Sequence, residues 1–440
     1  MPGDTFTDAR YMVVSVDAHV GPPTEMFADY CPARYRDDFD LAVRRAKASM
    51  GPPGRTFETV AKKALGLESV DPALLAAAER ANLVAGQWDP DARRADMDAD
   101  GVSADVIFHG TQNGEQLPFV ADALFVTGSG GNPELEAVGC RMYNRWLADF
   151  VSGCPDRHAG LAYVPWSDID AAVEELTWAR EAGLRGVNFP SPHQKRPYYY
   201  DQSYEPIWAA AADLEMPLTT HAAGGDRWDY EDGVLGQAFQ IMELGFLARR
   251  SIWQLIFSGV FERYPNLTYV LTEARATWVN EVIRDLDYAY TDTVNPTLRE
   301  RLPRLPSEYW MTHCYVGGSF LSHDEAALYP DRGAVNIMWG SDYPHLEGTF
   351  PYTLSSLQAT FAGIRPDYVR PMIGLTAAKV YGFDVERLNR IAARIGPTEQ
   401  QLSQPPAERP GPEYVGRGFR DSSSWPASAY HRREMTATAS

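Results

Sequence analysis

The 440-residue sequence is poor in cysteine, lacks long apolar runs and has fewer basic than acidic residues. Its four cysteines lie far apart and form no CxxC pair, which argues against a zinc knuckle or a disulfide framework and favours a reducing, cytoplasmic setting. The N-terminal stretch MPGDTFTDARY has no apolar core of signal-peptide length, and no run approaches the roughly 18 apolar residues of a membrane-spanning helix. We therefore expect a cytoplasmic protein that does not associate with membranes.

The shortage of positive charge limits the partners. The formal net charge is -19, whereas a nucleic-acid surface needs a positive field, so we expect no nucleic-acid partner. The hydrophobic content of 45% is enough for a sizeable core. No glycine-rich phosphate turn follows the first predicted strand, which disfavours a doubly wound dinucleotide-binding sheet.

Short apolar runs alternate with amphipathic helical segments about eight times over most of the chain. This alternation predicts the α/β class, and within it a (β/α)8 barrel of the TIM type. The predicted strands are 11–16, 105–109, 158–166, 184–191, 216–225, 267–274, 310–320 and 336–342, with a glycine pair weakening the seventh. The predicted helices are 90–101, 132–150, 169–183, 205–215, 252–264, 278–290 and 376–383.

The predicted barrel domain spans residues 1–395 and contains a helical insertion at about 40–89, after strand one. Residues 396–440 form an extended tail rich in proline and serine. Its aromatic residues favour docking on a surface, such as that of a neighbouring subunit, and we expect a homodimer; a disordered end is the alternative. These aromatic residues are Tyr414, Phe419, Trp425 and Tyr430.

Metal-ligating residue types fall at the ends of predicted strands. Asp17 and His19 follow strand one, His221 ends strand five, and Asp342 ends strand eight. Each alone has an ordinary explanation, such as a turn cap or a polar loop residue. Together, on the face where barrel enzymes carry their sites, they predict one divalent metal ion with an open position. Zinc is our first choice, and ligand type does not separate it from manganese or iron.

Several motifs of this chain resemble one family. They are VSVDAHVGPP, WDPDARRADMDADGV, YEPIWAAAADLEMPLTTHAAGG, LTEARATWV, WGSDYPHLEGT and AAKVYGFD, spread over residues 11–385. The pattern is similar to the amidohydrolase superfamily, in the amidohydrolase-2 branch that includes aminocarboxymuconate semialdehyde decarboxylase. WGSDYPH is the most specific of these motifs, whereas DAH alone is a weak signal.

The resemblance implies a ligand set of Asp17, His19, His221 and Asp342. In an alternative register His19 takes the first histidine position of the family's His-x-His motif, Gly21 takes the second, and Asp17 only precedes the motif. Glu273 stands where the family usually has a histidine at strand six. Strand four contains no lysine, so the carbamylated bridge of two-metal members is missing and one metal is expected.

Three functions remain open. We first expect a hydrolase that acts on a small cyclic, aromatic or unsaturated substrate through a metal-activated water. The alternatives are a non-oxidative decarboxylase of an aromatic or unsaturated acid, and a catalytically inactive barrel with a binding role. Asp342 is the expected general base or proton donor, with Glu273 and His345 in proton transfer and substrate orientation. For His345 a simple loop hydrogen bond is the alternative, and for His109 a loop or supporting position.

Overall fold

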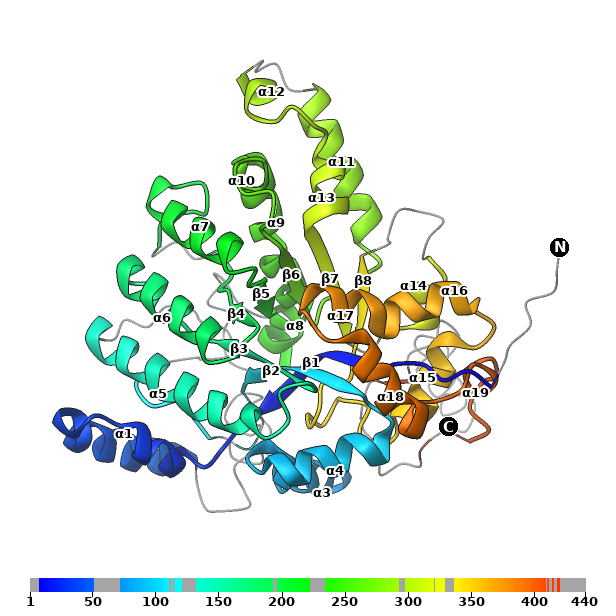
Figure 1. Cartoon of the computed structure of the whole chain (residues 1–440), viewed down its shortest axis with the longest axis horizontal. Helices are drawn as coiled ribbons and strands as arrows, with labels where there is room; N and C mark the ends of the chain where they lie inside the picture. Colours follow the sequence, from blue (N-terminus) through cyan, green and yellow to red (C-terminus); the bar gives the residue numbers. More distant parts are fainter. Residues whose placement is uncertain are drawn as a thin grey trace, which may run out of the picture.

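Eight parallel strands form one sheet in the order β1 to β8, and helices surround it (Figure 1). The computed structural model describes residues 8–50, 72–110, 113, 115–120, 132–192, 196–221, 234–292, 297–319, 321–328, 336–408, 410, 414 and 418–419. The strands are β1 (Val14–Val20), β2 (Ala104–His109), β3 (His158–Ala162), β4 (Gly186–Asn188), β5 (Leu218–His221), β6 (Tyr269–Thr272), β7 (Cys314–Ser319) and β8 (Ile337–Gly340). The predicted (β/α)8 barrel is confirmed.

The barrel is nearly closed by contacts between β1 and the end of β8. The backbone N–H of Asp342 donates to the carbonyl of Asp17 at 2.8 Å, and that of His19 donates to the carbonyl of Tyr343 at 2.6 Å. Ala18 and Tyr343 form a parallel bridge. These contacts place the motif DAH, in β1, beside the motif SDYPH, which follows β8.

The helices follow the strands in the expected alternation. They and the short helical turns are η1 (Thr24–Tyr30), η2 (Ala33–Tyr35), α1 (Arg36–Met50), α3 (Pro72–Asn82), η3 (Ala85–Gln87), α4 (Pro90–Asp100), α5 (Pro133–Ser152), α6 (Ile169–Glu181), η4 (Gln202–Tyr204), α7 (Glu205–Asp213), α8 (Val234–Ala248), α9 (Arg250–Phe257), α10 (Val260–Arg263), α11 (Val279–Asp292), α12 (Thr297–Arg301), α13 (Pro306–His313), α14 (His323–Ala327), α15 (Thr353–Phe361), α16 (Pro366–Arg370), η5 (Pro371–Leu375), α17 (Thr376–Val380), α18 (Val385–Ile395) and α19 (Glu399–Leu402).

Local sequence explains the helix ends that were predicted well. Helix α4 begins after Asp89, whose side chain accepts hydrogen bonds from two backbone N–H groups of the first turn. It ends at Gly101, which has a φ of 78° that favours glycine. Asn132 caps α5 in the same way, and a proline follows each of these two caps.

Strand β1 contains a β-bulge. Ser15 of β1 pairs with Asp105 of β2, and the next pair is Ala18 with Ile107. Between these pairs β1 has two residues and β2 has one, so β1 holds one extra residue. A bulge interrupts the alternation of side chains along a strand. Val14 and Val16, before or at the bulge, belong to the apolar cluster inside the barrel, and the polar side chains that turn inward after it are Asp17 and His19. Before the bulge the even-numbered side chains of β1 point into the barrel, and after it the odd-numbered ones do.

The barrel interior and the layer between strands and helices form separate apolar clusters. The interior cluster includes Val106 and Phe108 of β2, Leu161 of β3, Val270 of β6 and Met338 of β8. The outer cluster is larger and contains most of the buried aromatic residues of α5, α7 and α13. Trp339 and Trp278 are 1% and 5% exposed, which agrees with the packing role that their positions indicate.

Several predictions differ from the structure. Strand one was predicted at residues 11–16, but β1 spans Val14–Val20 and so contains Asp17 and His19 instead of preceding them. Helix α19 lies in the segment predicted to be an extended tail.

Strand β7 begins at Cys314 because residues 310–313 belong to α13, and its glycine pair lies within the strand. A side chain at Gly317 would stand 2.9 Å from a methyl group of Val16, so glycine permits close packing there rather than breaking the strand. The single helix predicted at 252–264 is two helices, α9 and α10, separated at Gly259 with a φ of 73°. Helix α8 was not predicted.

The described part of the tail packs on its own chain. The Tyr414 hydroxyl donates to the carbonyl of Gly348 at 2.7 Å, and the Gly418 backbone N–H donates to that hydroxyl at 3.0 Å. The other two aromatic residues predicted to dock, at positions 425 and 430, lie outside the described residues, as do residues 51–71 of the predicted insertion. No described helix combines the length and the apolar character needed to cross a membrane.

Candidate metal centre

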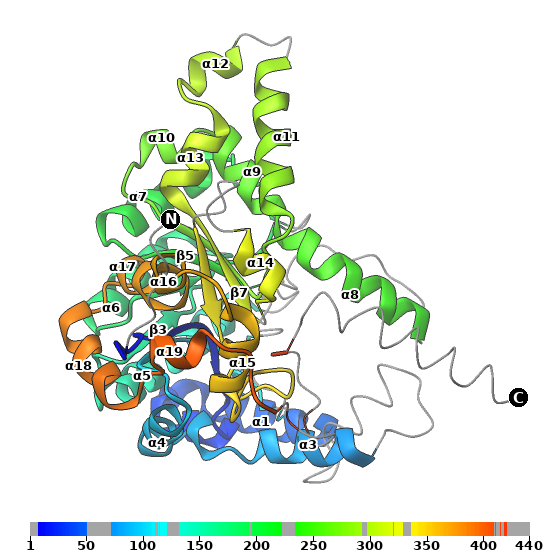
Figure 2. The same cartoon turned by 90° about the vertical axis from the view of Figure 1, so that its right-hand side faces the viewer.

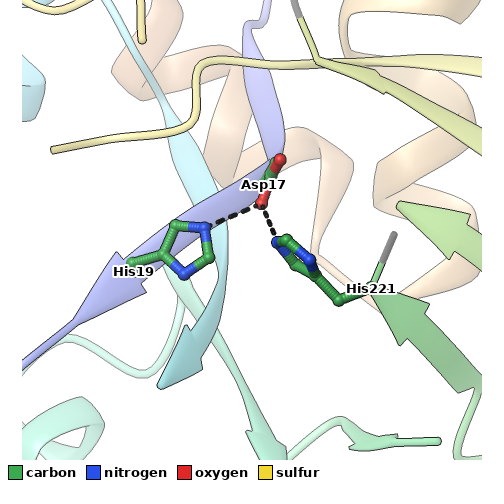
Figure 3. Close-up of side chains that lie close together, drawn as sticks. All are labelled: Asp17, His19 and His221. Carbon is green, nitrogen blue, oxygen red and sulfur yellow. Dashed lines mark ion pairs between the residues drawn. The ribbon is translucent and has the colours of Figure 1, made fainter. Parts of the chain in front are cut away.

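Two histidines and two aspartates converge at the carboxyl ends of β1, β5 and β8. His19 Nε2 lies 3.2 Å from Oδ1 of Asp17 and 3.0 Å from Oδ1 of Asp342. His221 Nε2 lies 3.7 Å from the same Asp17 oxygen, so both histidines point at Asp17 (Figure 3). All four side chains are buried. The structure therefore brings the four predicted ligands together. Asp17 lies beside His19, as in the first of the two registers considered for this motif.

Asp17, His19 and His221 form one group whose ligand atoms all lie within 4.8 Å of one another, and Asp342 joins His19 and His345 in a second such group. The two groups share His19, and the spacing within each fits a bound cation. Ligands bonded at about 2.1 Å in tetrahedral or octahedral geometry lie roughly 3.0–3.4 Å from one another. The separations of 3.0, 3.2 and 3.7 Å are close to that range. Within the described chain, Asp17 Oδ1, both ring nitrogens of His19 and Oδ2 of Asp342 make no hydrogen bond, whereas Oδ1 of Asp342 has His345 Nδ1 at 2.9 Å. Buried polar atoms are costly without partners, and a cation between them would satisfy this set.

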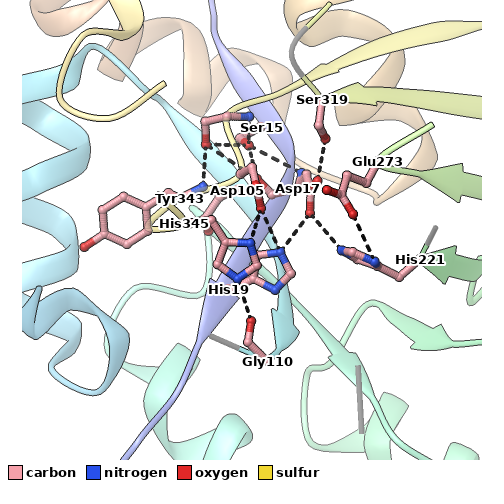
Figure 4. A network of polar contacts seen from close by, with 12 residues as sticks. Ser15, Asp17, His19, Asp105, Gly110, His221, Glu273, Ser319, Tyr343 and His345 are labelled. Carbon is pink, nitrogen blue, oxygen red and sulfur yellow. Dashed lines mark hydrogen bonds and ion pairs between the residues drawn. The ribbon is translucent and has the colours of Figure 1, made fainter. Parts of the chain in front are cut away.

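Asp17 is held in its ionised form. Burial alone would raise its pKa, but contacts with His19 and His221 hold that pKa well below its ordinary value. The Ser319 hydroxyl donates to the other carboxylate oxygen, Oδ2. One oxygen of Asp17 is thus fixed by β7 while the other faces the histidines (Figure 4).

His345 approaches the same carboxylate oxygen of Asp342 as His19 does. Its Nδ1 is 2.9 Å from Asp342 Oδ1, its Nε2 is 2.9 Å from the carbonyl oxygen of Gly110, and its ring stacks on His19 at 3.9 Å. Both nitrogens face acceptors, which suits an imidazolium with a proton on each nitrogen. Burial alone would lower the pKa of His345, but the Asp342 carboxylate raises it to about 10. His345 thus contacts Asp342, and it also makes the loop hydrogen bond that was its alternative role.

Glu273 contacts His221 from the end of β6. Its Oε2 lies 3.5 Å from Nδ1 of His221, and a quarter of the Glu273 side-chain surface is exposed. Burial raises the pKa of Glu273 to about 8; His221 opposes this increase, and the charges of Asp342 and Asp17 add to it. A carboxylate in this position orients the ring of a metal-ligating histidine.

Glu273 and Asp342 both have left-handed backbone conformations, with φ values of 54° and 56°. Non-glycine residues rarely adopt such values, and they persist where the surrounding structure holds them. Asp342 is held by its backbone bond to β1 and by the 2.8 Å bond from the His345 N–H to its carbonyl. Glu215, which precedes β5, has a similar φ of 51°, so this conformation is not confined to the end of the barrel that carries the site.

A serine pair and a glycine support the position of Asp17. The Ser15 hydroxyl donates to the Asp17 carbonyl at 2.7 Å, lies 2.9 Å from the Ser341 hydroxyl and accepts from the Ser341 N–H at 2.8 Å. A side chain at Gly340 would stand 2.7 Å from Cβ of Asp17. The glycine of the WGSD motif thus allows β8 to approach the bulge of β1.

A buried ion network lies behind the site. Arg93 of α4 pairs with Asp105 of β2 at 2.8 Å and donates to the carbonyl of His19 at 2.8 Å. His158 of β3 binds the other oxygen of Asp105 at 2.8 Å. Burial alone would raise the pKa of Asp105, but Arg93 and His158 lower it to about 2. The network connects helix α4 to the backbone of a predicted metal ligand.

Sequence reasoning did not find all of the polar residues here. Ser15, Ser319 and Arg93 lack a local signal, because serine and arginine are common and their partners are distant in sequence. Glu347 forms a possible ligand group with Glu273 and Asp342, and it lies within the quoted motif WGSDYPHLEGT. His109 is buried at the rim of β2, and burial lowers its pKa to about 3. Its ring packs on Tyr143, which agrees with a supporting position.

A cavity of about 300 Å³ lies against His345. It is bounded by α3, by the loop after β8 and by the tail. The lining residues are Ala77, Arg80, Ala81, Val84, Pro344, His345, Leu346, Phe350, Pro351, Tyr352 and Tyr414. Most of these side chains are apolar or aromatic, which is typical of small-molecule sites.

The protein is a (β/α)8 barrel with a candidate metal site, formed by two histidines and two aspartates, at the carboxyl ends of its strands. The family model of the amidohydrolases matches residues 16–383, and the chain belongs to that family. The resemblance inferred from the sequence motifs is confirmed.

Relatives by sequence carry decarboxylase names. The chain is 24% identical over 229 residues to a gamma-resorcylate decarboxylase of Rhodococcus jostii, covering 46% of this chain and 65% of that protein. It is 26% identical over 279 residues to a 2-amino-3-carboxymuconate-6-semialdehyde decarboxylase of Dictyostelium discoideum, covering 58% and 67%. The match therefore spans slightly less than two thirds of the Rhodococcus protein.

Solved structures show the same fold. The 5-carboxyvanillate decarboxylase from Sphingomonas paucimobilis superimposes with a TM-score of 0.57 at 18% identity, over 85% of this chain and all (100%) of that one. The corresponding enzyme from Novosphingobium aromaticivorans, solved with bound manganese, gives 0.58 at 18% identity over 84% and 97%. At such identity the likeness establishes the barrel alone.

Proposed function

We propose that this protein is a metal-dependent, non-oxidative decarboxylase of a small aromatic or unsaturated carboxylic acid. The observation that carries the proposal is the convergence of Asp17, His19, His221 and Asp342, with buried oxygen and nitrogen atoms directed at one another. The decarboxylase names of the relatives support this reaction over hydrolysis, which the sequence favoured first.

We assign these four residues as the ligands of one divalent metal ion. Two imidazole nitrogens and two carboxylates suit zinc, manganese or iron. Manganese is the first ion to test, because it is bound in the Novosphingobium structure. A cation here would supply positive charge to substrate oxygens as negative charge develops on them.

Asp342 is the proposed proton carrier. In decarboxylation the bond from the ring or alkene carbon to the carboxyl group breaks, its electron pair stays on that carbon, and carbon dioxide leaves. The carbon then takes a proton, which Asp342 would deliver after taking one up from solvent, so that its carboxylate is restored at the end of the step. His345 contacts Asp342 at 2.9 Å and holds its orientation, and Glu273 does the same for His221 at 3.5 Å.

The cavity beside His345 would suit a flat, largely apolar substrate body. Its lining includes His345 and none of the four assigned ligands, so His345 is the link between the cavity and the proposed metal site. Its aromatic and proline lining would pack against a ring or a conjugated chain. The volume of about 300 Å³ is at the small end of ligand sites, which fits a single-ring acid.

The reaction class is tested with metal-loaded protein in isotopically labelled water. Candidate aromatic carboxylates, lactones and amides are incubated and the products are analysed by mass spectrometry. Decarboxylation releases carbon dioxide and places one solvent hydrogen on carbon, whereas hydrolysis incorporates solvent oxygen. Oxygen incorporation without carbon dioxide release would reject the proposal in favour of the hydrolase.

The ligand assignment is tested by metal analysis. We expect about one divalent ion per chain in the wild type and a large loss in His221→Ala. His313→Ala is the matched control, because His313 is also a buried histidine but ends helix α13, where its Nδ1 is 3.0 Å from the carbonyl of Leu267. Equal metal content in both variants would remove His221 from the site. A wild type without stoichiometric metal would favour the inactive barrel.

A further inference from the structure

Helix α8 exposes a stripe of large apolar side chains. Leu235, Phe239, Met242 and Phe246 are 71%, 48%, 79% and 51% exposed. Near the C-terminal end of the helix Leu247 is buried. Figure 2 shows α8 extending outward from the barrel, beyond the helices that ring the strands. A soluble protein rarely exposes such a patch unless it is an interaction surface.

The composition of α8 limits what can cover this stripe. Glu243 is the only charged residue of α8, which contains no lysine or arginine. Helices that lie on membranes carry basic residues along their polar face, so a lipid surface does not fit. A strongly charged protein partner would find no complementary charges here either. The stripe fits another neutral, apolar helix.

The spacing of the four residues fits a second copy of the same helix. Their separations of four, three and four residues follow the alternating a and d positions of a heptad repeat. The pattern is also symmetric about the midpoint between Phe239 and Met242. In an antiparallel pair related by a two-fold axis, Leu235 would face Phe246 and Phe239 would face Met242. The same axis keeps Glu243 away from its own counterpart.

The area is sufficient for a modest interface. Fully exposed side chains of this size present on the order of 150–250 Å² each, so the exposed part of the stripe amounts to roughly 450 Å² per copy. A pair of helices would then bury about 900 Å² from these side chains, below the roughly 1,200 Å² of stable interfaces and in the range of weak ones. The net charge of -19 opposes association of two copies, and the neutral stripe adds no local charge to that repulsion.

We propose that α8 forms an antiparallel two-helix contact with α8 of a second copy of this chain, and that this contact produces a homodimer. Light scattering on the full-length protein tests it. We expect a mass twice the 49.0 kDa of the chain for the wild type and a shift to the monomer mass for Met242→Asp. Leu83→Asp is the matched control, because Leu83 is 77% exposed but lies outside the stripe. Circular dichroism checks that both variants fold.

Cross-linking tests the register. Leu235→Cys and Phe246→Cys variants should form disulfide-linked dimers when mixed with each other, and far less when each is oxidised alone. A monomeric wild type, or a Met242→Asp protein that remains dimeric, would overturn the proposal. A dimer that survives Met242→Asp but is lost when residues 420–440 are deleted would assign the contact to the tail instead.

Discussion

At the scale of single residues, the site depends on atoms that are brought close by unusual local geometry. Asp342 has a left-handed φ of 56°, yet its backbone makes bonds on both sides that hold it there. Asp17 relies on a bulge and on a glycine at position 340 that leaves room for its Cβ. Substitutions at these positions should therefore affect function more than the general stability of the barrel.

Asp342→Asn should lower kcat by a factor of roughly 100 or more, because acid–base catalysis by a positioned side chain typically contributes 10²- to 10⁴-fold. Steady-state kinetics on the substrate found in the labelled-water experiment measure the effect. Asp96→Asn is a suitable comparison, since Asp96 accepts from the Tyr343 hydroxyl at 2.6 Å beside the same loop. Wild-type turnover in Asp342→Asn would exclude this carboxylate from proton transfer.

Gly340→Ala should weaken metal binding by roughly 10- to 100-fold, the range seen when a group that positions a ligand is disturbed. The new methyl group would stand 2.7 Å from Asp17 Cβ and 2.9 Å from Ser319 Oγ, so Asp17 must move. Competition with a chelator measures the affinity. Gly153→Ala, where the nearest atom would be 3.7 Å away, should bind metal normally. Equal affinities would show that Asp17 tolerates displacement or is not a ligand.

At the scale of secondary-structure elements, α4, β1, β2 and β3 are joined by the network of Arg93, Asp105 and His158. The Arg93 guanidinium also lies over the Tyr343 ring at 4.8 Å, and so reaches the loop after β8. These ionic groups are enclosed by protein, where an unpaired charge is expensive. The network should matter to stability as well as to the position of β1.

Asp105→Asn should destabilise the protein by about 3 kcal/mol at pH 7, because removing one charge of a buried pair leaves Arg93 uncompensated. The folded-state pKa of Asp105, about 2, lies below the ordinary value of 3.8, so its stabilising contribution is present above pH 4 and is lost as pH falls toward 2. Urea unfolding at several pH values should show the difference from wild type shrinking below pH 4.

Asp98→Asn provides the comparison for that experiment. Asp98 pairs with Arg157 at 2.6 Å but is 42% exposed, so its loss should cost less than about 1 kcal/mol. Equal destabilisation by the two substitutions would contradict the importance assigned to burial.

At the scale of the whole molecule, segments distant in sequence complete the surroundings of the site. Helix α3, from the region predicted as an insertion, and Tyr414 of the tail both line the cavity beside His345. Tyr414 also binds the carbonyl of Gly348, whose N–H in turn donates to the carbonyl of His345 at 2.9 Å. The tail is therefore linked to the loop that carries Asp342 and His345.

A chain ended after residue 408 should have a higher KM and a lower kcat than one ended after residue 419. The difference between the two truncations isolates the contribution of Tyr414 and its neighbours. We expect a several-fold loss in kcat/KM, since a misplaced positioning group commonly costs that much. Tyr414→Phe, which lacks only the hydroxyl, separates the hydrogen bond from the ring packing. Identical kinetics for both truncated chains would place the tail outside the function of the site.

The sequence by itself determined the barrel, the bounds of helices such as α4, α5 and α6, and the four residues that converge. Periodicity and the residues at strand ends report these features directly, because a strand or helix depends on neighbours a few positions away. The positions of Asp17 and His19, two residues apart, were enough to place both side chains on one side of a strand. The amidohydrolase family followed from motifs that survive in the linear sequence.

Only the tertiary structure decided the features that depend on contacts between distant segments. The bulge in β1 appears in its pairing with β2, and the start of β7 at Cys314 depends on helix α13 packing beside it. The serine and arginine residues that hold Asp17 and His19 have partners up to 326 positions away. Helix α8 contains two glycines that weaken its helical pattern, and its exposed stripe is evident only once the barrel leaves that face uncovered. Local patterns cannot report such features, because they arise from three-dimensional proximity.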